Sequence, residues 1–535
     1  MVIQRTAAQA VAAQPLDEAL ARHWLDRLFP PAAEGGPVDW QKLACALALR
    51  GRLSVITGGP GTGKTYTAAR LLALLFATAP DAGQLRVALA APTGKAAARL
   101  KQSIDGALLQ LQGSMGGEID LAGLVQRMGA ARTLHSMLGA RPDTRHWGFH
   151  AGRQLDVDVL IVDEASMVHL EMMAALLEAL PAGARLVLLG DKDQLASVEA
   201  GAVLGDLCRD AQAGRYLPDT LDYALRVAGQ AVPPQFAAPA GDRPPALAQH
   251  TVMLRESRRF GGPHRPVGAR RECRPRRPPP GLARCRHARR YALRTLGAPG
   301  RRRAGRDRTG RARAWRPGQL CAVCQGASKQ AGCGRRLRGR APGLGGRRAA
   351  GLRALPAAVR RARGGLGRVR PQPGGGAGPG SAGRDPPQRR MVCGRPVMVT
   401  RNDAQLGVFN GDIGIALPGG AHGGSQGGLQ GGPGQPLRVY FLQGDELRSV
   451  GVSRLAHVET AFAMTVHKSQ GSEFEHTALV LPSRGGSVLG RELVYTGITR
   501  ARQAFSLFSE VPGLLASAVG SPTQRASGLL RWLQD

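Results

Sequence analysis

The chain has 535 residues, of which 73 are Lys or Arg and 38 are Asp or Glu, so its formal net charge is +35. This length predicts two to four domains with sizeable cores. The sequence has no apolar run of about 18 residues, which argues against a membrane span. Its N-terminus lacks a basic patch followed by an apolar stretch, which argues against a secretory signal. Eight cysteines are too few for a disulfide scaffold, so we expect a reduced, cytoplasmic protein.

Between residues 41 and 210, apolar runs alternate with amphipathic stretches, which is typical of a parallel α/β sheet. We predict four buried strands, at Leu53–Thr57, Arg86–Ala91, Val157–Asp163 and Arg185–Gly190. Each is followed by a polar or glycine-containing loop. Because open α/β sheets bind ligands at the carboxyl ends of their strands, these loops predict a shared ligand site.

The loop after the first strand has the pattern G-x-x-x-x-G-K-T. It consists of Gly58, Gly59, Pro60, Gly61, Thr62, Gly63, Lys64 and Thr65, and it opens a helix predicted over Tyr66–Ala77. The glycines let backbone N–H groups surround phosphate oxygens, and the helix N-terminus adds positive potential. We expect Lys64 to reach the β- and γ-phosphates of a nucleotide and Thr65 to bind Mg²⁺.

Acidic and amide side chains follow the later strands. Asp163 and Glu164 come after the third predicted strand, where Asp163 can bind Mg²⁺ and Glu164 can act as the general base for an attacking water. Gln194 follows the fourth strand and can sense the γ-phosphate. The alternative for Asp163 and Glu164 is a solvated acidic pair, which the phosphate loop earlier in the chain disfavours. Gln194 taken alone would be part of a polar turn, and only its position in this series of strand ends indicates a role.

Residues 261–390 differ from the rest of the chain. They hold 35 Lys or Arg and 3 acids, so the remainder of the chain is nearly neutral. Gly, Pro and Arg make up 75 of these 130 residues, a composition that buries too little apolar surface to offset chain entropy. We therefore predict that 261–392 is disordered. The explanation we favour for this composition is that GC-rich coding DNA is read out of frame from just after Phe260 to near Cys393. The alternatives are a basic linker that binds nucleic acid and a metal module at Cys321, Cys324 and Cys333.

Four motifs occur in the order seen in superfamily 1 DNA helicases. They are Gly58–Thr65, Asp163–Ser166, Gly190–Gln194 and Val466–Gly471. More narrowly, the chain over about 24–260 and 393–535 resembles the RecD family, the alpha subunits of exodeoxyribonuclease V. Further segments carry this resemblance: Ala91–Leu100, Thr133–His135, Leu254–Phe260, Gly394–Asp403, Thr460–Phe474 and Leu493–Arg502.

The resemblance implies an α/β fold with two RecA-like P-loop motor domains built on parallel sheets. We assign 41–255 to the first, 256–260 to the start of the second and 393–535 to its remainder, with a small SH3-like β insert over about 411–457. The disordered or out-of-frame stretch would interrupt the second domain. Family members carry a larger N-terminal docking domain, so we expect residues 1–40 to be a remnant of it.

For the nucleotide, the resemblance implies an adenine-reading role for Gln41 and places Tyr66 beside the ATP loop. It places Gln470, Gly471 and Glu473 on the nucleotide side of a later motif. Arg259 matches the arginine that reaches the γ-phosphate from the second domain. Arg500 matches an arginine finger, which stabilises charge on the transferring phosphoryl group.

For DNA, the resemblance implies a single-strand track on both motor domains. On the first domain the track would consist of Pro92, Thr93, Gly94, Lys95, Thr133 and His135. On the second it would consist of Thr465, His467, Lys468 and Ser469. Small and hydroxylic residues suit hydrogen bonds to phosphate.

The implied activity is that of an ATP-driven, Mg²⁺-dependent DNA helicase. The resemblance further implies 5′→3′ movement, duplex DNA ends as substrate, and membership with beta and gamma subunits of a complex for double-strand break repair and recombination, with the nuclease on another subunit. Two alternatives are a stand-alone RecD-like helicase and a nucleotide-binding fragment without motor activity.

Overall fold

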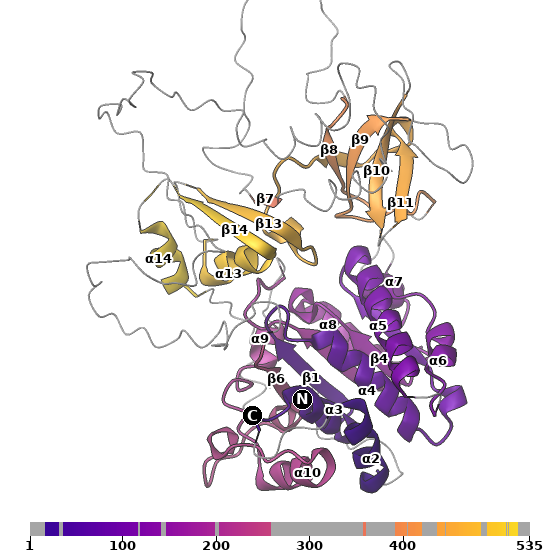
Figure 1. Cartoon of the computed structure of the whole chain (residues 1–535), viewed down its shortest axis with the longest axis vertical. Helices are drawn as coiled ribbons and strands as arrows, with labels where there is room; N and C mark the ends of the chain where they lie inside the picture. Colours follow the sequence, from indigo (N-terminus) through magenta and orange to yellow (C-terminus); the bar gives the residue numbers. More distant parts are fainter. Residues whose placement is uncertain are drawn as a thin grey trace, which may run out of the picture. The chain divides into compact units, whose positions relative to one another are not determined.

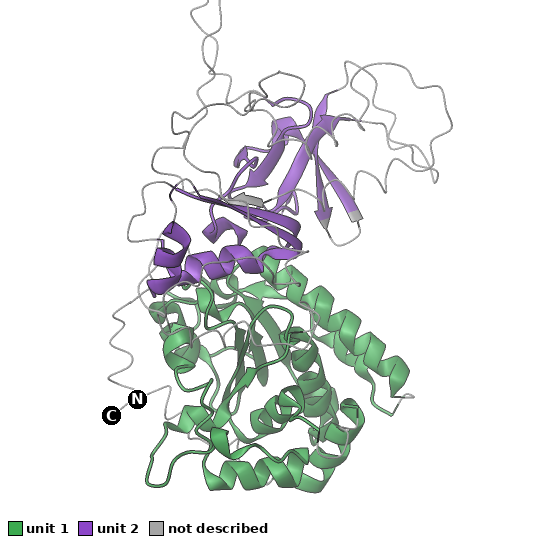
Figure 2. Ribbon diagram, turned by 60° about the vertical axis from the view of Figure 1, so that its left-hand side comes forward, with its two compact units in different colours: residues 1–279, 524–535 green, residues 280–523 purple. Residues whose placement is uncertain are grey.

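The computed structural model describes residues 16–30, 36–115, 118–140, 146–197, 203–257, 357–359, 391–403, 405–419, 436–443, 446–482, 489–509, 511 and 513–522. The chain divides into two compact units, residues 1–279 with 524–535, and residues 280–523 (Figure 2). Arg259 lies outside the described residues, as does most of the segment predicted to be disordered.

The first unit is built on a six-stranded parallel sheet (Figure 1). Its strands, in spatial order, are β3 (Arg132–Thr133), β2 (Val87–Ala91), β4 (Val159–Val162), β5 (Arg185–Gly190), β1 (Leu53–Gly58) and β6 (Thr251–Leu254). The four predicted strands occupy its centre, which confirms the predicted α/β fold class. Because every neighbouring pair is parallel, the carboxyl ends of all six strands meet at one edge.

Alternate strand residues face two separate hydrophobic cores. In β5, Val187 and Leu189 lie in one core, whereas Leu186 and Leu188 lie in the other. The first core is covered by α2 (Glu18–Leu28), α3 (Trp40–Arg50), α4 (Lys64–Thr78), α5 (Gly94–Ser114), α6 (Leu121–Arg127) and α10 (Pro218–Ala228). The second is covered by α7 (Leu134–Met137), α8 (Leu170–Ala179) and α9 (Val203–Leu207). Burial of each aliphatic side chain contributes about 1.5–3 kcal/mol to folding stability. The two cores together therefore hold the strands, and with them the carboxyl edge of the sheet, in place.

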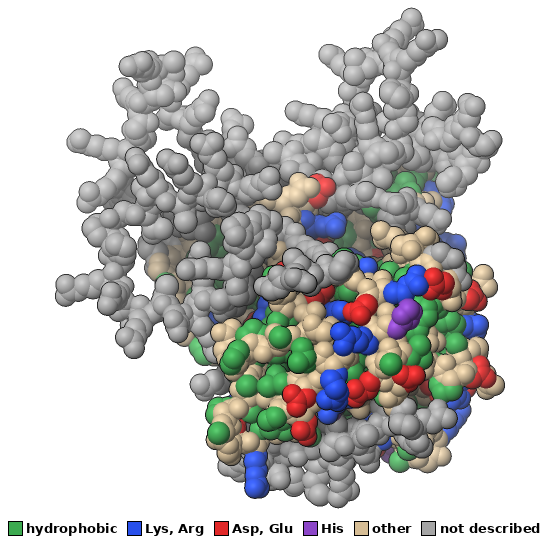
Figure 3. Space-filling model, turned by 60° about the horizontal axis from the view of Figure 1, so that its bottom comes forward, with side chains coloured by type: hydrophobic (Ala, Val, Ile, Leu, Met, Phe, Trp, Pro, Cys, Tyr) green, Lys and Arg blue, Asp and Glu red, His purple; other side chains and the backbone are tan. Residues whose placement is uncertain are grey.

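Short 3₁₀ turns complete the first unit, at Ala82–Gln84, Ala165–Met167, Pro234–Phe236 and Ala246–His250. Charges on its surface are mixed: acidic and basic side chains are interspersed over the described part of the face drawn in Figure 3. Several form ion pairs, such as Arg226 with Glu18 at 3.0 Å and Lys42 with Asp26 at 2.6 Å. This agrees with the near neutrality of the chain outside residues 261–390.

The second unit contains two sheets. One is antiparallel, in the order β11 (Glu446–Gly451), β10 (Leu437–Gln443), β9 (Ile413–Pro418), β8 (Pro396–Val399) and β12 (Val458–Thr460). It includes the section predicted as a small β insert and extends beyond it at both ends. Its core contains Val397, Val439 and Phe441.

The other sheet of this unit is parallel, in the order β14 (Ala501–Ser509), β13 (Phe474–Leu481) and β7 (Ala357–Val359). It is accompanied by α13 (Arg491–Thr499) and α14 (Leu514–Gly520), and by 3₁₀ turns at Val452–Arg454 and His467–Ser469. Strand β7 lies in the segment predicted to be disordered, and it is ordered by backbone pairing with Thr477–Leu479. None of the described helices is long and apolar enough to cross a membrane.

Candidate functional site

The phosphate-binding loop joins β1 to α4 at the carboxyl edge of the first sheet. Gly61 and Gly63 have φ angles of 75° and 89°, a region that glycine adopts at little cost. The Lys64 ammonium donates hydrogen bonds to the carbonyl oxygens of Gly58, at 2.6 Å, and Gly59, at 3.2 Å. The ammonium therefore lies over the loop, at the N-terminus of a 15-residue helix, where an anionic group is favoured.

Gln41 reaches this loop from α3. Its Nε2 donates to the carbonyl oxygen of Thr62 at 2.8 Å. The start of α3 is fixed because Asp39 Oδ1 accepts from the backbone N–H groups of Gln41 and Lys42, at 2.9 and 3.0 Å. A Cβ at Gly63 would overlap the Gln41 amide, so the contact requires glycine there. The structure thus places the predicted adenine reader against the phosphate loop.

Asp163 and Glu164 follow β4 at the same edge. Burial and the Glu164 charge raise the pKa of Asp163 to about 6, although Lys64 and Arg99 act in the opposite sense. The Glu164 N–H donates to Asp163 Oδ1 at 2.8 Å. Glu164 has a φ of 51°, which costs a non-glycine residue about 1–2 kcal/mol. Strain of this kind is concentrated at functional sites.

Asp191, directly after β5, is a site residue that the sequence analysis missed as an individual. Its side chain is buried and accepts from Gln194 Nε2 and from the Asp193 N–H, each at 3.1 Å. Burial raises the pKa of Asp191, and Lys64 lowers it, so both Asp163 and Asp191 feel the same ammonium. Asp191 orients the predicted γ-phosphate sensor Gln194. An acid directly after a buried strand, the signal that identified Asp163, was present here too.

Two further residues tie the end of β6 to the nucleotide side. Ser257 Oγ donates to the Pro60 carbonyl oxygen at 2.8 Å. The Arg255 guanidinium lies over the rings of Trp40 and Phe236, at 4.5 and 4.2 Å from their centroids. The sequence analysis gave neither residue a role: it noted the segment Leu254–Phe260 only for its resemblance and did not predict β6 as a strand of this sheet.

The residues predicted to bind DNA on the first unit lie on neighbouring strands. Thr133 pairs with Ala91, so Pro92–Lys95 and His135 follow adjacent strand ends. The Thr93 hydroxyl accepts from the Ala96 N–H at 3.3 Å and caps α5, whereas the Thr133 hydroxyl accepts from the Ser136 N–H at 3.1 Å and caps α7. His135 is exposed.

On the second unit, the residues predicted to bind DNA lie within Thr465–Ser469, which form a tight turn. Thr465 Oγ1 accepts from the Lys468 N–H at 3.3 Å, and Ser469 is buried with its hydroxyl donating to the Val466 carbonyl oxygen at 2.7 Å. The Lys468 ammonium pairs with Glu459. His467 is half-buried.

Arg500 directly follows α13, as its C-cap, and is buried within the second unit. Its Nε and Nη1 donate to the carbonyl oxygens of Thr496 and Ser472, each at 3.3 Å. Gln470, Gly471 and Glu473 belong to the same turn as Ser472, so the structure brings the expected nucleotide-side residues of this unit together. Glu473 also pairs with Arg502 at 3.4 Å.

The donor set on the first unit fits Mg²⁺. Mg²⁺ takes oxygen ligands and needs one or two protein groups besides substrate phosphates. Asp163 supplies a half-buried carboxylate whose pKa is raised by desolvation and by the neighbouring Glu164 charge, an unfavourable charge pair that a bound cation would offset, and Thr65 supplies a hydroxyl. Among the described residues no cluster of three or more His, Cys, Asp or Glu side chains could hold a metal by itself.

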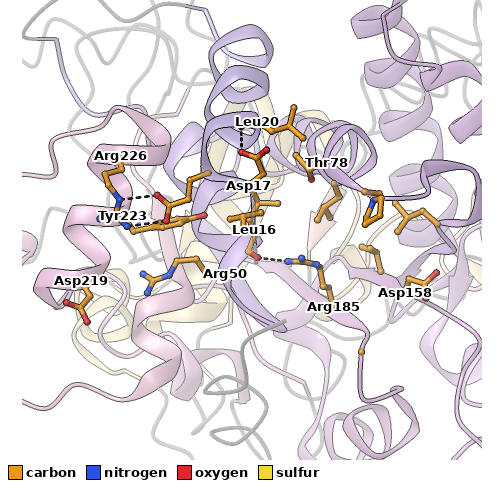
Figure 4. Close-up of a pocket in the computed structure, with 18 of the residues that line it drawn as sticks. Leu16, Asp17, Leu20, Arg50, Thr78, Asp158, Arg185, Asp219, Tyr223 and Arg226 are labelled. Atoms are coloured by element: carbon orange, nitrogen blue, oxygen red, sulfur yellow. Dashed lines mark hydrogen bonds and ion pairs between the residues drawn. The ribbon is translucent and has the colours of Figure 1, made fainter. Parts of the chain in front are cut away.

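A cavity of about 1050 Å³ lies at the opposite, amino-terminal edge of the same sheet (Figure 4). Arg50 and Arg185 line it. Arg185 donates to the carbonyl oxygens of Ala48 and Leu49, at 3.3 and 2.6 Å, and thereby caps the last turn of α3. Burial lowers the pKa of Arg185 to about 10. This cavity contains none of the predicted nucleotide or DNA residues.

Comparison with known proteins gives two matching family models. Residues 41–200 match an AAA domain, and residues 460–507 match a UvrD-like helicase C-terminal domain. The first covers five of the six strands of the first sheet and the loops that carry the phosphate site, and the second covers β13, α13 and Arg500.

Similar proteins extend over nearly the whole chain. The RecBCD enzyme subunit RecD of Haemophilus influenzae is 33% identical, with 96% of this chain and 74% of that protein covered. Its counterpart in Mycobacterium tuberculosis (strain CDC 1551 / Oshkosh) is 36% identical over 96% of this chain and 75% of its own length. The ATP-dependent RecD2 DNA helicase of Deinococcus radiodurans is 30% identical over 89% of this chain and 51% of its own length.

Proposed function

Since the chain belongs to the RecD family of ATP-dependent DNA helicases, we propose that it is the motor subunit of a RecBCD-type exodeoxyribonuclease V. In this proposal it moves 5′→3′ along one DNA strand, consumes ATP with Mg²⁺, and works in the cytoplasm with beta and gamma subunits on duplex ends. The process served is double-strand break repair and recombination.

One observation supports the motor role above others. Lys64, Asp163 and the Asp191–Gln194 pair come from three different strand ends and surround one phosphate loop. A nucleotide-binding domain needs the loop alone, whereas a buried glutamine held by a buried acid adds a group that can respond to loss of the γ-phosphate. Such a response is what couples hydrolysis to movement.

Each residue of the phosphate site has a proposed role. Lys64 contacts the β- and γ-phosphates, and Thr65 with Asp163 would hold Mg²⁺, which would neutralise phosphate charge. Glu164 orients and deprotonates the attacking water. Gln194 contacts the γ-phosphate, and Gln41 reads the adenine.

Two arginines are proposed to complete the site: Arg259, from the segment that resembles the start of the second motor domain, and Arg500. When ATP binds, the Arg500 guanidinium exchanges its carbonyl acceptors for phosphoryl oxygens. Because this anionic partner exists only while the triphosphate is present, ATP favours the closed state and hydrolysis removes the preference. Alternating grip on DNA by Pro92–Lys95 and Thr465–Ser469 converts closure into steps.

DNA-stimulated ATP hydrolysis tests the proposal. We expect oligo(dT) to stimulate the wild-type ATPase, Lys64→Ala to abolish it, and Lys101→Ala to leave it unchanged. Lys101 is a matched control because it pairs with Asp105 at 2.6 Å within α5 and touches no part of the phosphate site. Duplexes with a 5′ tail should be unwound in preference to duplexes with a 3′ tail.

A second candidate function, a nucleotide-binding fragment without motor activity, is favoured by the composition of residues 261–390, which interrupts the second domain. Nucleotide binding that depends on Lys64, together with an ATPase that oligo(dT) does not stimulate, would establish the fragment and refute the motor. Co-purification with the beta and gamma subunits tests the assembly, whereas full unwinding without them would indicate a stand-alone helicase.

A further inference from the structure

An aromatic and basic surface lies beside the DNA residues of the first unit. It is formed by His135 on α7 and by Trp147, Phe149 and Arg153 in the loop that follows, and is called here the Trp147 platform. The ring centroids of His135 and Trp147 are 6.1 Å apart with an interplanar angle of 46°. The Arg153 guanidinium lies 5.0 Å from the centroid of Phe149.

Backbone contacts hold the platform in place. The N–H groups of Gly148 and Phe149 both donate to the Leu138 carbonyl oxygen, at 2.9 and 3.1 Å. Gly139, with a φ of 68°, lies so close that a Cβ there would come within 3.1 Å of the Gly148 Cα. Trp147 packs one side against the second core and is only half-buried. Its exposed area is therefore presented by a segment, residues 147–149, whose backbone is held against Leu138 and Gly139.

Basic side chains predominate over acidic ones in the two described segments that form the platform. The described segments 128–140 and 146–155 contain no Asp or Glu, and they carry Arg132, His135, His146, His150 and Arg153. Several basic side chains elsewhere on the first unit are paired with acids, as in Arg226 with Glu18. The platform also continues the surface formed by Thr133 and the Pro92–Lys95 loop.

We propose that Trp147 is a stacking platform for an unpaired base of single-stranded DNA, and that Arg153 neutralises a phosphate of the same strand. This inference rests on the proposed DNA track and adds a base contact to it. A half-buried indole beside an imidazole, with a guanidinium on the ring two residues along, suits a base better than it suits an acidic protein, because a nucleotide offers an aromatic face and an anion together. The contact is independent of sequence, since every base has such a face.

Replacement of the indole tests the stacking. We expect Trp147→Ala to weaken oligo(dT) binding roughly five- to 150-fold, the range for loss of one aromatic–base stack, and Trp147→Phe to retain most of the affinity. Stacking carries no net charge, so the salt dependence should not change in Trp147→Ala. In contrast, Arg153→Ala should lower the slope of log affinity against log salt by about 0.7, as for one lost phosphate contact on a single strand.

An abasic oligonucleotide separates stacking from loss of structure. Wild type and Trp147→Ala should bind it equally, because only the base contact is removed. If Trp147→Ala fails to fold, Trp147→Phe takes its place. The fluorescence of Trp147, obtained as the difference between wild type and Trp147→Phe, should be quenched by oligo(dT) and unaffected by the abasic strand. Trp24 is the matched control, since it also lies beside a histidine and an arginine, and Trp24→Ala should bind oligo(dT) as wild type does.

Two results overturn the inference in different ways. Equal oligo(dT) affinity of folded Trp147→Ala and wild type, or an equal loss on the abasic strand, removes the platform and leaves the helicase proposal intact. A wild-type chain that binds no oligo(dT) in any nucleotide state removes the proposed DNA function and the platform with it.

Discussion

Replacing Asp163 by Asn should stabilise the metal-free protein at neutral pH and abolish ATP hydrolysis. Burial and the charge of Glu164 raise the pKa of Asp163 from 3.8 to about 6. Because the pKa is higher in the folded than in the unfolded state, the ionised carboxylate opposes folding above about pH 6. The opposition disappears as the pH falls below about 3.8, where both states are protonated.

The size of the effect follows from the shift. A pKa difference of about two units corresponds to at most about 3 kcal/mol of destabilisation at pH 7. Because the carboxylate has partial solvent access, the expected effect ranges from that maximum down to about 1 kcal/mol. Asn keeps an oxygen that accepts from the Glu164 N–H, so that hydrogen bond survives. A domain of this size gains about 2–4 °C in melting temperature per kcal/mol, so we expect a rise of roughly 2–12 °C.

Thermal unfolding in the presence of a chelator, at about pH 7 and about pH 4, measures this difference. Asp158→Asn is the control of opposite sign. Hydrogen bonds from Arg86 lower the pKa of Asp158, so this change should destabilise the protein at neutral pH and have less effect as the pH falls through the Asp158 pKa. A lower melting temperature for Asp163→Asn at pH 7, or the same gain at both pH values, would refute the reasoning.

Three other substitutions test the nucleotide site. Gly63→Ala should weaken ATP binding about tenfold or more, because alanine is strained at a φ of 89° and its Cβ overlaps Gln41. The double variant with Gln41→Ala should regain part of the lost stability in thermal unfolding. Unchanged ATP affinity of the single variant would contradict the geometry. Asp191→Ala leaves the Gln194 amide without its carboxylate partner. Steady-state kinetics should therefore show the DNA-stimulated kcat reduced about 10- to 100-fold and the Kd for ATP little changed. A weakened Kd with an unchanged kcat would show that Asp191 does not act by positioning Gln194. Arg500→Lys should reduce kcat about 1000-fold with nearly unchanged ATP affinity in the same assays, whereas a wild-type rate would exclude an arginine finger.

Sequence patterns predicted the centre of the first sheet and missed its edges. The strands at Leu53, Val87, Val159 and Arg185 are apolar runs followed by loops of glycine, hydroxylic or acidic residues, so the local sequence pattern identifies them. Strand β3 has two residues and β6 has four, too few for a periodicity to emerge. Both are ordered by pairing with a neighbouring strand that is distant in sequence.

The same distinction applies to the site. The phosphate loop and Asp163 could be identified because the required residues are contiguous. The Gln194–Asp191 and Ser257–Pro60 hydrogen bonds depend on side-chain orientation and on contact across the sheet, which no spacing encodes. Roles assigned by resemblance alone, such as that of Arg500, gave no indication that this side chain is buried against two carbonyl groups.

The central claim is that one nucleotide is contacted by side chains from both motor domains. An experimental structure of the chain with ADP, a γ-phosphate mimic and oligo(dT) tests it most directly. The account predicts Lys64 and the Arg500 guanidinium on opposite sides of the mimic, each within hydrogen-bond distance. Arg500 still bonded to the carbonyl oxygens of Thr496 and Ser472, with the mimic held by the first unit alone, would contradict it.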